Sequence, residues 1–284
     1  MASKYVSTTL PPLRESRPLL PHVPLAVILS MNEGSRLTTE ALSDLRTLCP
    51  ETRIQINMGW KDGNAPHITT TAHDLVDAYR HCCRAVAECD GPVLIVEEDA
   101  VFLNRNRVHY ARVDEFVAKR NYDIYSLGSF GEFSADDKGE HHRRFVSRLG
   151  FSQAIVWNKS ARDMILARPE GDMHIDVHTL SAMKRKYTYY RPLVVQLFPT
   201  TENMRTWCIE CTQSSRERIV VCAWQGFLQR VLGLDRCPDG WTTLYKMNDA
   251  IRHVKQGIGV VKGLALYVVG TLVVFLMIRG RRQK

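Results

Sequence analysis

The sequence predicts an α/β protein in which short apolar strands alternate with amphipathic helices. The clearest strand lies within Gly91–Leu103, GPVLIVEEDAVFL, where Val93–Val96 form an apolar run that follows Gly-Pro. Three acidic residues come directly after this run: Glu97, Glu98 and Asp99. Because buried carboxylates are costly unless they are paired or metal-bound, we expect the strand to deliver them to a sheet edge, where α/β folds bind ligands.

The composition is that of an ordinary globular protein. The 284 residues are 45% hydrophobic and 24% charged, enough for one sizeable domain with an appendage or for two small domains. The net charge of +8 is compatible with nucleic acid, anionic lipid or a phosphorylated substrate as partner. The basic residues are spread out and no aromatic–basic repeat occurs, so we expect no nucleic acid. Eight cysteines in a chain of this length do not resemble a secreted disulfide scaffold.

Apolar periodicity predicts the elements that precede the acidic strand. Leu25–Leu29 is a buried strand, and Arg53–Met58 alternates as a second one. Between them we expect a polar turn containing Asn32 and a helix over Thr38–Leu48. Residues 1–24 contain five prolines and no long apolar core, so we interpret them as a flexible or extended leader and not as a secretory signal.

A further helix is expected to begin at Thr71 and to lead into the acidic strand. Thr71 and Asp74 form a capping-box-like start, and Tyr79 and Cys82 belong to the apolar stripe. Cys82 and Cys83 lie on or beside that stripe, which favours structural thiols over catalytic ones.

The alternation continues through the second half of the chain. We expect a helix over Val108–Arg120, strands over Tyr122–Gly128, Gly150–Trp157 and Tyr187–Phe198, and a helix capped by Asn158 that ends at Ala167. The polar segment Ser129–Arg148 is expected to be a mobile loop, with a second metal site among its acidic and His residues as the alternative.

The C-terminal part divides into three segments. Residues 208–256 are amphipathic, and we expect them to lie either on a lipid interface or against the main domain. Residues 257–278 are long and apolar enough for a transmembrane helix, and the basic tail 279–284 follows. The tail favours a cytoplasmic C-terminus with a translocated domain, but no signal for translocation is visible, so we expect the domain in the cytosol. A four-thiolate zinc site is left open for Cys208, Cys211, Cys222 and Cys237.

The three consecutive acids have two interpretations. In an extended backbone, Glu97 and Asp99 face one side and Glu98 the other. Such a pair of carboxylates is a hard oxygen site suited to Mg2+ or Mn2+ that also holds phosphate oxygens. The alternative is a solvated acidic turn without a ligand.

Several segments, in order and spacing over about Leu25–Trp207, resemble glycosyltransferase family 25, the lipopolysaccharide and collagen galactosyltransferase type. The similar segments are Ala72-His73, Val96-Glu97-Glu98-Asp99, YDIYSLG, GFSQAIVWNKSARDMIL, HIDVHTL with Asp176 at the position of the family Asp, and Gln196. The chain departs from the family where Ala72 replaces Ser, where Glu98 replaces Asp, and where the first strand keeps only Ser30-Met31-Asn32.

The resemblance implies a GT-A-like nucleotide-sugar domain over residues 25–207, a mixed Rossmann-like sheet flanked by helices. It also implies an inverting transfer of a hexose, galactose or glucose, from a nucleotide-diphosphate sugar to a hydroxyl of a glycan, lipid or protein. The divalent cation, Mn2+ or Mg2+, would be held by Glu97 and Asp99 and would neutralise the leaving diphosphate.

The remaining roles implied by the resemblance fall to residues outside the acidic pair. Asp176 is the expected base, with His178 as alternative or orienting partner. Asn32, His73 and Glu98 are expected to hold the donor, although His73 is equally compatible with capping its helix. Two other functions remain open: an inactive glycosyltransferase-like binding domain, and a membrane structural or interaction protein.

Overall fold

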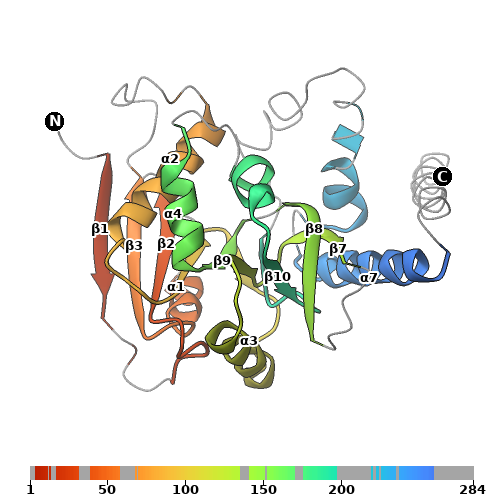
Figure 1. Ribbon diagram of the computed structural model, residues 1–284, viewed down its shortest axis with the longest axis horizontal. Coiled ribbons are helices and arrows are strands. Elements are labelled where there is room, and N and C mark those ends of the chain that lie inside the picture. The colour runs from red at the N-terminus through yellow and green to blue at the C-terminus, as the bar shows by residue number, and fades with distance from the viewer. Residues whose placement is uncertain are drawn as a thin grey trace.

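The fold is a mixed α/β architecture with a large sheet between two layers of helices (Figure 1). The computed structural model describes residues 4–11, 13, 17–31, 39–57, 68, 70–134, 141–150, 152–169, 175–196, 219, 222–223, 225–234 and 237–258. The predicted α/β class with a mixed sheet is confirmed over these residues.

The elements alternate along the chain as the apolar pattern predicts. The strands are β1 (Tyr5–Leu10), β2 (Leu25–Met31), β3 (Glu51–Asn57), β4 (Val93–Glu97), β5 (Ala100–Phe102), β6 (Ile124–Ser126), β7 (Phe130–Phe133), β8 (His142–Gly150), β9 (Ala154–Trp157), β10 (Lys186–Tyr189) and β11 (Val194–Gln196). The helices are α1 (Thr39–Leu45), α2 (Thr71–Ala85), α3 (Arg107–Lys119), α4 (Lys159–Ala167) and α7 (Gly240–Ile258), with π-helical turns η1 (Ile175–Leu180) and η2 (Phe227–Val231).

The main sheet combines parallel and antiparallel pairs in the order β1-β3-β2-β4-β9-β6-β10-β8-β7. β2 pairs in parallel with both β3 and β4, and β9 runs antiparallel between β4 and β6. β10 is parallel to β6, and a separate antiparallel pair joins β5 to β11. The carboxyl ends of β3, β2, β4, β6 and β10 therefore follow one edge of the sheet, which we call the carboxyl edge.

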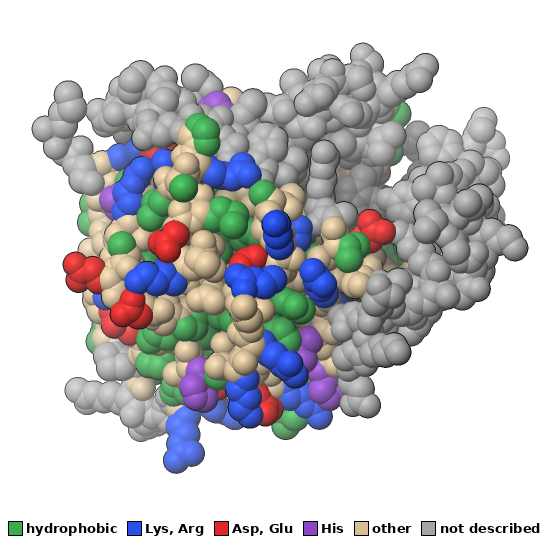
Figure 2. All heavy atoms as spheres, viewed as in Figure 1, with side chains coloured by type: hydrophobic (Ala, Val, Ile, Leu, Met, Phe, Trp, Pro, Cys, Tyr) green, Lys and Arg blue, Asp and Glu red, His purple; other side chains and the backbone are tan. Residues whose placement is uncertain are grey.

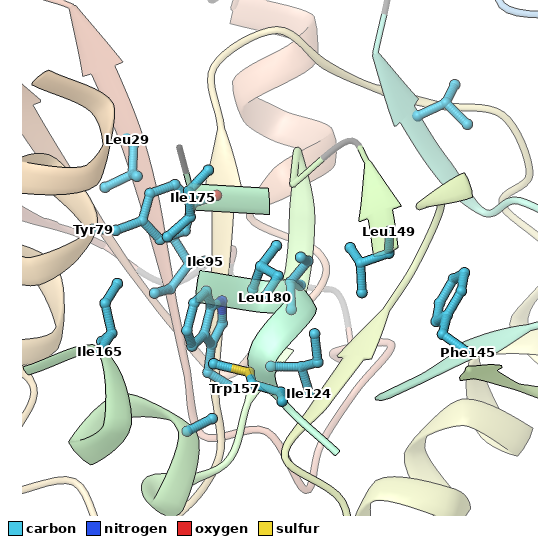
Figure 3. Packing of buried hydrophobic residues seen from close by; sticks show 14 of the residues in the cluster. Leu29, Tyr79, Ile95, Ile124, Phe145, Leu149, Trp157, Ile165, Ile175 and Leu180 are labelled. Atoms are coloured by element: carbon cyan, nitrogen blue, oxygen red, sulfur yellow. The ribbon is translucent and has the colours of Figure 1, made fainter. Parts of the chain in front are cut away.

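Successive residues of the central strands enter two different cores. Val93 and Ile95 of β4 pack in a first core against α2, α4, η1, η2 and α7, whereas Leu94 and Val96 pack in a second core against α1 and α3. Figure 3 shows the first core, where Tyr79 of α2 lies beside Leu29 and Ile95. A strand covered on both faces needs consecutive apolar residues, which explains the run Val93–Val96.

The leader predicted as flexible or extended over residues 1–24 contains a strand of the main sheet. Tyr5–Leu10 forms β1, which pairs antiparallel with β3, and Leu20 and Val23 are buried. Lys4 Nζ lies 2.5 Å from Asp74 Oδ1, so the segment is also tied to α2. Pairing with β1 gives β3 a neighbour on its outer side, which explains why this segment is ordered.

The starts of α1, α2, α3 and α4 are predicted to within one residue. The N-cap of α2 is Thr70 and not Thr71, and its hydroxyl accepts from the backbone N–H of His73. Asn158 caps α4 as predicted, accepting from the N–H of Lys159. The Asn158 amide nitrogen also donates to Tyr122 O at 3.0 Å, which fixes this side chain between α4 and the strand β6 that follows Tyr122.

Two strands replace much of the mobile loop predicted over Ser129–Arg148. β7 and β8 form an antiparallel pair in which the rings of Phe133 and Phe145 lie 5.2 Å apart, with both side chains buried. The polar–apolar alternation of β8 is broken, because Arg143 is buried and Val146 is exposed, and this hid the strand in the sequence. The run Tyr187–Phe198 likewise divides at Pro192 into β10 and β11.

The C-terminal region is part of the same fold. Phe227, Leu228 and Trp241 are buried in the first core, and Tyr245 donates a hydrogen bond to Ser129 O. Of the two expectations for residues 208–256, packing on the main domain is the one observed for η2 and α7, and the domain therefore extends beyond 207. The span predicted over 257–278 lies almost wholly outside the described residues, among which no helix is long and apolar enough to cross a membrane.

Gly128 is required where β6 ends and the chain before β11 crosses it. A Cβ at this position would lie 1.8 Å from Val194 O, a backbone atom, while Val194 N and Leu193 N both donate to Leu127 O. We predict that Gly128→Ala lowers the free energy of unfolding by about 1–3 kcal/mol or more, measured by urea denaturation, because the backbone must shift.

Gly226→Ala is the matched control for Gly128→Ala. Gly226 has φ −60 and a Cβ there would have no neighbour within 4 Å. The control should be neutral or stabilising by about 0.4–1 kcal/mol. Equal effects of the two substitutions would contradict the close approach at Gly128.

Candidate functional site

The candidate site is built on the turn that follows β4 at the carboxyl edge. Glu97 N donates to Gln153 O at 2.8 Å and Glu98 N donates to Leu29 O at 3.0 Å. These bonds hold the backbone between the strands β9 and β2 as it leaves the sheet. Glu98 and Asp99 form the turn itself, and β5 begins at Ala100.

Glu97 is held by two hydroxyl groups in the first core. Its Oε1 accepts from Ser152 Oγ at 2.5 Å and from Tyr79 Oη at 2.9 Å. Burial, followed by the charge of Glu97, raises the pKa of Tyr79 well above its usual value, so the phenol stays protonated as a donor. The carboxylate thus has a fixed orientation relative to α2 and to the start of β9.

Glu98 and Asp99 are held by other elements. Glu98 Oε2 accepts from Ser30 Oγ of β2 at 2.6 Å, and Asp99 Oδ2 accepts from Gln196 Nε2 of β11 at 3.1 Å. Ser30 and Glu97 lie on opposite faces of the sheet. Because Glu98 contacts Ser30, Glu97 and Glu98 point to opposite faces, as expected. The shared face expected for Glu97 and Asp99 required an extended backbone, and the chain turns at Glu98 instead.

The second sheet and α7 hold the partner of Asp99. Gln196 is in register with Ala100 in the β5–β11 pair. Trp241 of α7 donates through Nε1 to Gln196 O at 2.8 Å, and its side chain is fully buried. Gln196 therefore connects Asp99 to α7, whose Trp241 lies 45 residues beyond Gln196 in the chain.

For the other predicted site residues, the structure describes His73 fully, Asp176 and His178 by their backbone, and Asn32 not at all. His73 lies in the first turn of α2, half-buried, and its N–H takes part in capping by Thr70 at 3.2 Å. Asp176 and His178 belong to η1, whose Ile175 and Leu180 pack in the first core, but their side chains are outside what the structure describes. Asn32 lies outside the described residues.

Tyr79, Ser152 and Ser30 are the contributors that sequence reasoning missed. Tyr79 was assigned to an apolar stripe, and the two serines lie in segments of the family resemblance without an assigned role. The signal in the sequence is indirect: a carboxylate at the end of a buried strand needs donors, and hydroxyl groups on neighbouring elements are the available ones.

The acidic turn carries oxygen atoms of the kind that hard divalent cations prefer, but no complete metal cage occurs among the described residues. Glu97 and Asp99 offer carboxylate oxygens, the ligands that Mg2+ and Mn2+ prefer. Among the described residues, no group of three or more His, Cys, Asp or Glu gathers as a metal site. An ion here would therefore need phosphate or water oxygens to complete its coordination.

The described cysteines do not suggest a thiolate centre. Burial raises the pKa of Cys82 well above its usual value and that of Cys83 to about 12, so both remain thiols, as expected for structural residues. Cys222 and Cys237 are exposed, and Cys208 and Cys211 lie outside the described residues.

No protein-family model and no curated protein matches the chain.

We predict that Tyr79→Phe lowers the free energy of unfolding by about 1–3 kcal/mol, because Glu97 loses a buried donor. Tyr122→Phe is the control, since the Tyr122 hydroxyl is buried without a hydrogen-bond partner among the described residues. Its removal should change stability little. Urea denaturation of both variants measures the difference, and equal effects would show that the Tyr79–Glu97 contact contributes nothing.

Proposed function

We propose that the chain is a metal-dependent inverting glycosyltransferase with a GT-A-like domain that uses a nucleotide-diphosphate sugar. The observation that carries the proposal is the acidic turn Glu97–Asp99 at the carboxyl end of a central parallel strand, with each acid held by a different element. Ligands of α/β sheets bind outside the carboxyl ends of the strands, which is where this turn lies.

Glu97 and Asp99 are the proposed ligands of Mn2+ or Mg2+. A bound divalent cation neutralises the charge that develops on the leaving nucleotide diphosphate. The hydroxyl groups of Tyr79 and Ser152 keep Glu97 oriented, and Gln196 does the same for Asp99. Such outer contacts are typical of carboxylates that bind metal ions.

Asp176 is the proposed general base, with His178 as the alternative. As the acceptor oxygen attacks the anomeric carbon, its proton passes to the carboxylate and the bond from the sugar to the phosphate oxygen breaks, which inverts the anomeric centre. Asn32, His73 and Glu98 are proposed to hold the donor. The transferred group is a hexose, galactose or glucose, and the acceptor is a hydroxyl of a glycan, lipid or protein.

We further propose that residues 257–278 anchor the enzyme in a membrane with the catalytic domain on the cytosolic side. The apolar composition of this segment and its flanking basic residues support the proposal. α7 packs on the domain and reaches Ile258, so an anchor would follow the domain without a long linker.

Donor binding without transfer is the second candidate function. It is favoured by the internal hydrogen bonds of Glu97 and Glu98, which a binding domain would also need, and by the incomplete metal cage among the described residues. Turnover distinguishes the two functions.

A thermal-shift titration of the full chain with nucleotide-diphosphate hexoses tests the donor site. We predict a rise in Tm with one such donor that requires Mn2+, as expected when a ligand binds only the folded state. Asp99→Asn should lose the rise, whereas Asp163→Asn, an exposed carboxylate on α4, should keep it. Equal rises in both variants would remove the metal role of Asp99.

The base is tested in the same preparations by donor hydrolysis and transfer. Asp176→Asn should keep the Mn2+-dependent rise in Tm and lose about 10²–10⁴-fold in rate. Transfer at the wild-type rate would reject Asp176 as base. A wild-type protein that binds the donor and shows no turnover would establish the binding function instead.

A further inference from the structure

The two outer edges of the main sheet are built differently. The sheet begins with β1 and ends with β7, so each of these strands has one neighbour in it. β7 has four residues, its register with β8 is irregular between Gly131 and Phe133, and its Glu132 is exposed. A short strand, an irregular register and a charge are the features that keep a sheet edge from pairing with another chain.

β1 has none of the features that protect β7. Its six residues, YVSTTL, pair with β3 without a register shift, from Tyr5 opposite Asn57 to Leu10 opposite Thr52. The strand contains no charged residue, no proline and no glycine, and its Tyr, Val and Thr residues are typical of strands. The whole length of β1 is therefore suited to pairing with a further strand.

The outer side of β1 is exposed. Val6, Ser7, Thr8 and Thr9 are all exposed, and the exposed fraction of Val6 is 46%. Because side chains alternate along a strand, four consecutive exposed residues mean that both faces are open here. No further strand of the described chain pairs with this edge, and Figure 1 shows β1 at the outer limit of the molecule. Such an edge presents a row of backbone N–H and C=O groups to an incoming strand.

The first residues of this edge are fixed on α2. Lys4 Nζ lies 2.5 Å from Asp74 Oδ1 and 3.2 Å from Asp77 Oδ2, so the charge next to β1 in the sequence is paired within the chain. Tyr5 donates through its hydroxyl to Asp77 Oδ2 at 2.6 Å, and its ring stacks on His81 with the ring centres 4.2 Å apart. The strand is therefore ordered before a partner arrives, which lowers the entropic cost of pairing.

We propose that a second copy of this chain pairs with β1 in antiparallel orientation, so that two nine-stranded sheets join across a two-fold axis. An axis perpendicular to the sheet places residues of the same face opposite one another. With the axis at Ser7, Val6 lies opposite Thr8 of the second copy, and with the axis at Thr8 it lies opposite Leu10 of the second copy. In both registers uncharged residues meet uncharged residues, and Val6 gains a neighbour on its own face.

The absence of charge on β1 favours a copy of itself as the occupant. Figure 2 shows acidic and basic side chains interspersed over the face that α2 and α4 cover, whereas β1 is uncharged along its whole length. A strand with charged residues would place them against this neutral edge without a counter-charge, and a second β1 avoids that cost. Six paired residues form less than a standard interface, so the dimer is weak and depends on protein concentration. The inference is independent of the proposed transferase activity.

Sedimentation velocity of the full chain in a non-ionic detergent tests the dimer. We expect a monomer–dimer equilibrium that Val6→Lys weakens at least about tenfold, since each dimer then holds two lysines at the paired edge. Val108→Lys changes an exposed valine of α3 and should associate as the wild type does. Thr8→Lys provides a second variant if Val6→Lys is unstable, and the Tm of each variant checks its folding.

Hydrogen exchange locates the contact. Backbone amides of β1 should exchange more slowly as the protein concentration rises, whereas those of β7 should not change. A monomer at every concentration, a dimer that Val6→Lys and Thr8→Lys leave unchanged, or exchange in β1 that is independent of concentration would overturn the proposal. A monomer whose β1 amides are protected only by an added, unrelated extended peptide would assign the edge to another partner and would overturn it as well.

Discussion

The hydrogen bonds that hold Glu97 at the end of β4 are the constraint on which the site depends. The strand itself is buried on both faces, so its end brings a carboxylate to the limit of two apolar cores. Tyr79 and Ser152 offset the cost of burying this carboxylate, because their hydroxyl groups donate to it at 2.9 and 2.5 Å. These donors come from α2 and from the start of β9, so the orientation of Glu97 depends on how both elements pack.

Glu98 and Asp99 are likewise held by hydrogen bonds from other parts of the chain. Glu98 turns towards Ser30 of β2, and Asp99 reaches Gln196 of β11. β11 can approach only because Gly128 has no side chain, and Trp241 of α7 then binds the carbonyl of Gln196. The acidic turn is therefore a junction between the parallel strands, the small second sheet and the C-terminal helix. A substitution that shifts any of these elements should change the positions of the three carboxylates.

The sequence predicted the elements whose signal is local. Val93–Val96 could be recognised as a buried strand, and Asn158 as a helix cap, because a few adjacent residues decide each outcome. β1 was missed because its order depends on pairing with the distant β3, and β8 was missed because the buried Arg143 and the exposed Val146 break the polar–apolar alternation. The extended backbone considered for the three acids gives way to a turn at Glu98 and Asp99, whose side chains contact β2 and β11, and no spacing in the sequence reveals these contacts. The roles of Asp176 and His178 stay predictions.

The most direct test of the site is the location of a bound metal. Crystals of the full chain grown with Mn2+ and a nucleoside diphosphate should give an anomalous peak at coordination distance from a carboxylate oxygen of Asp99 or Glu97, with the diphosphate on its far side. An ordered Mn2+–diphosphate pair bound elsewhere on the molecule would contradict the account, and the acidic turn would then be a structural junction without a ligand.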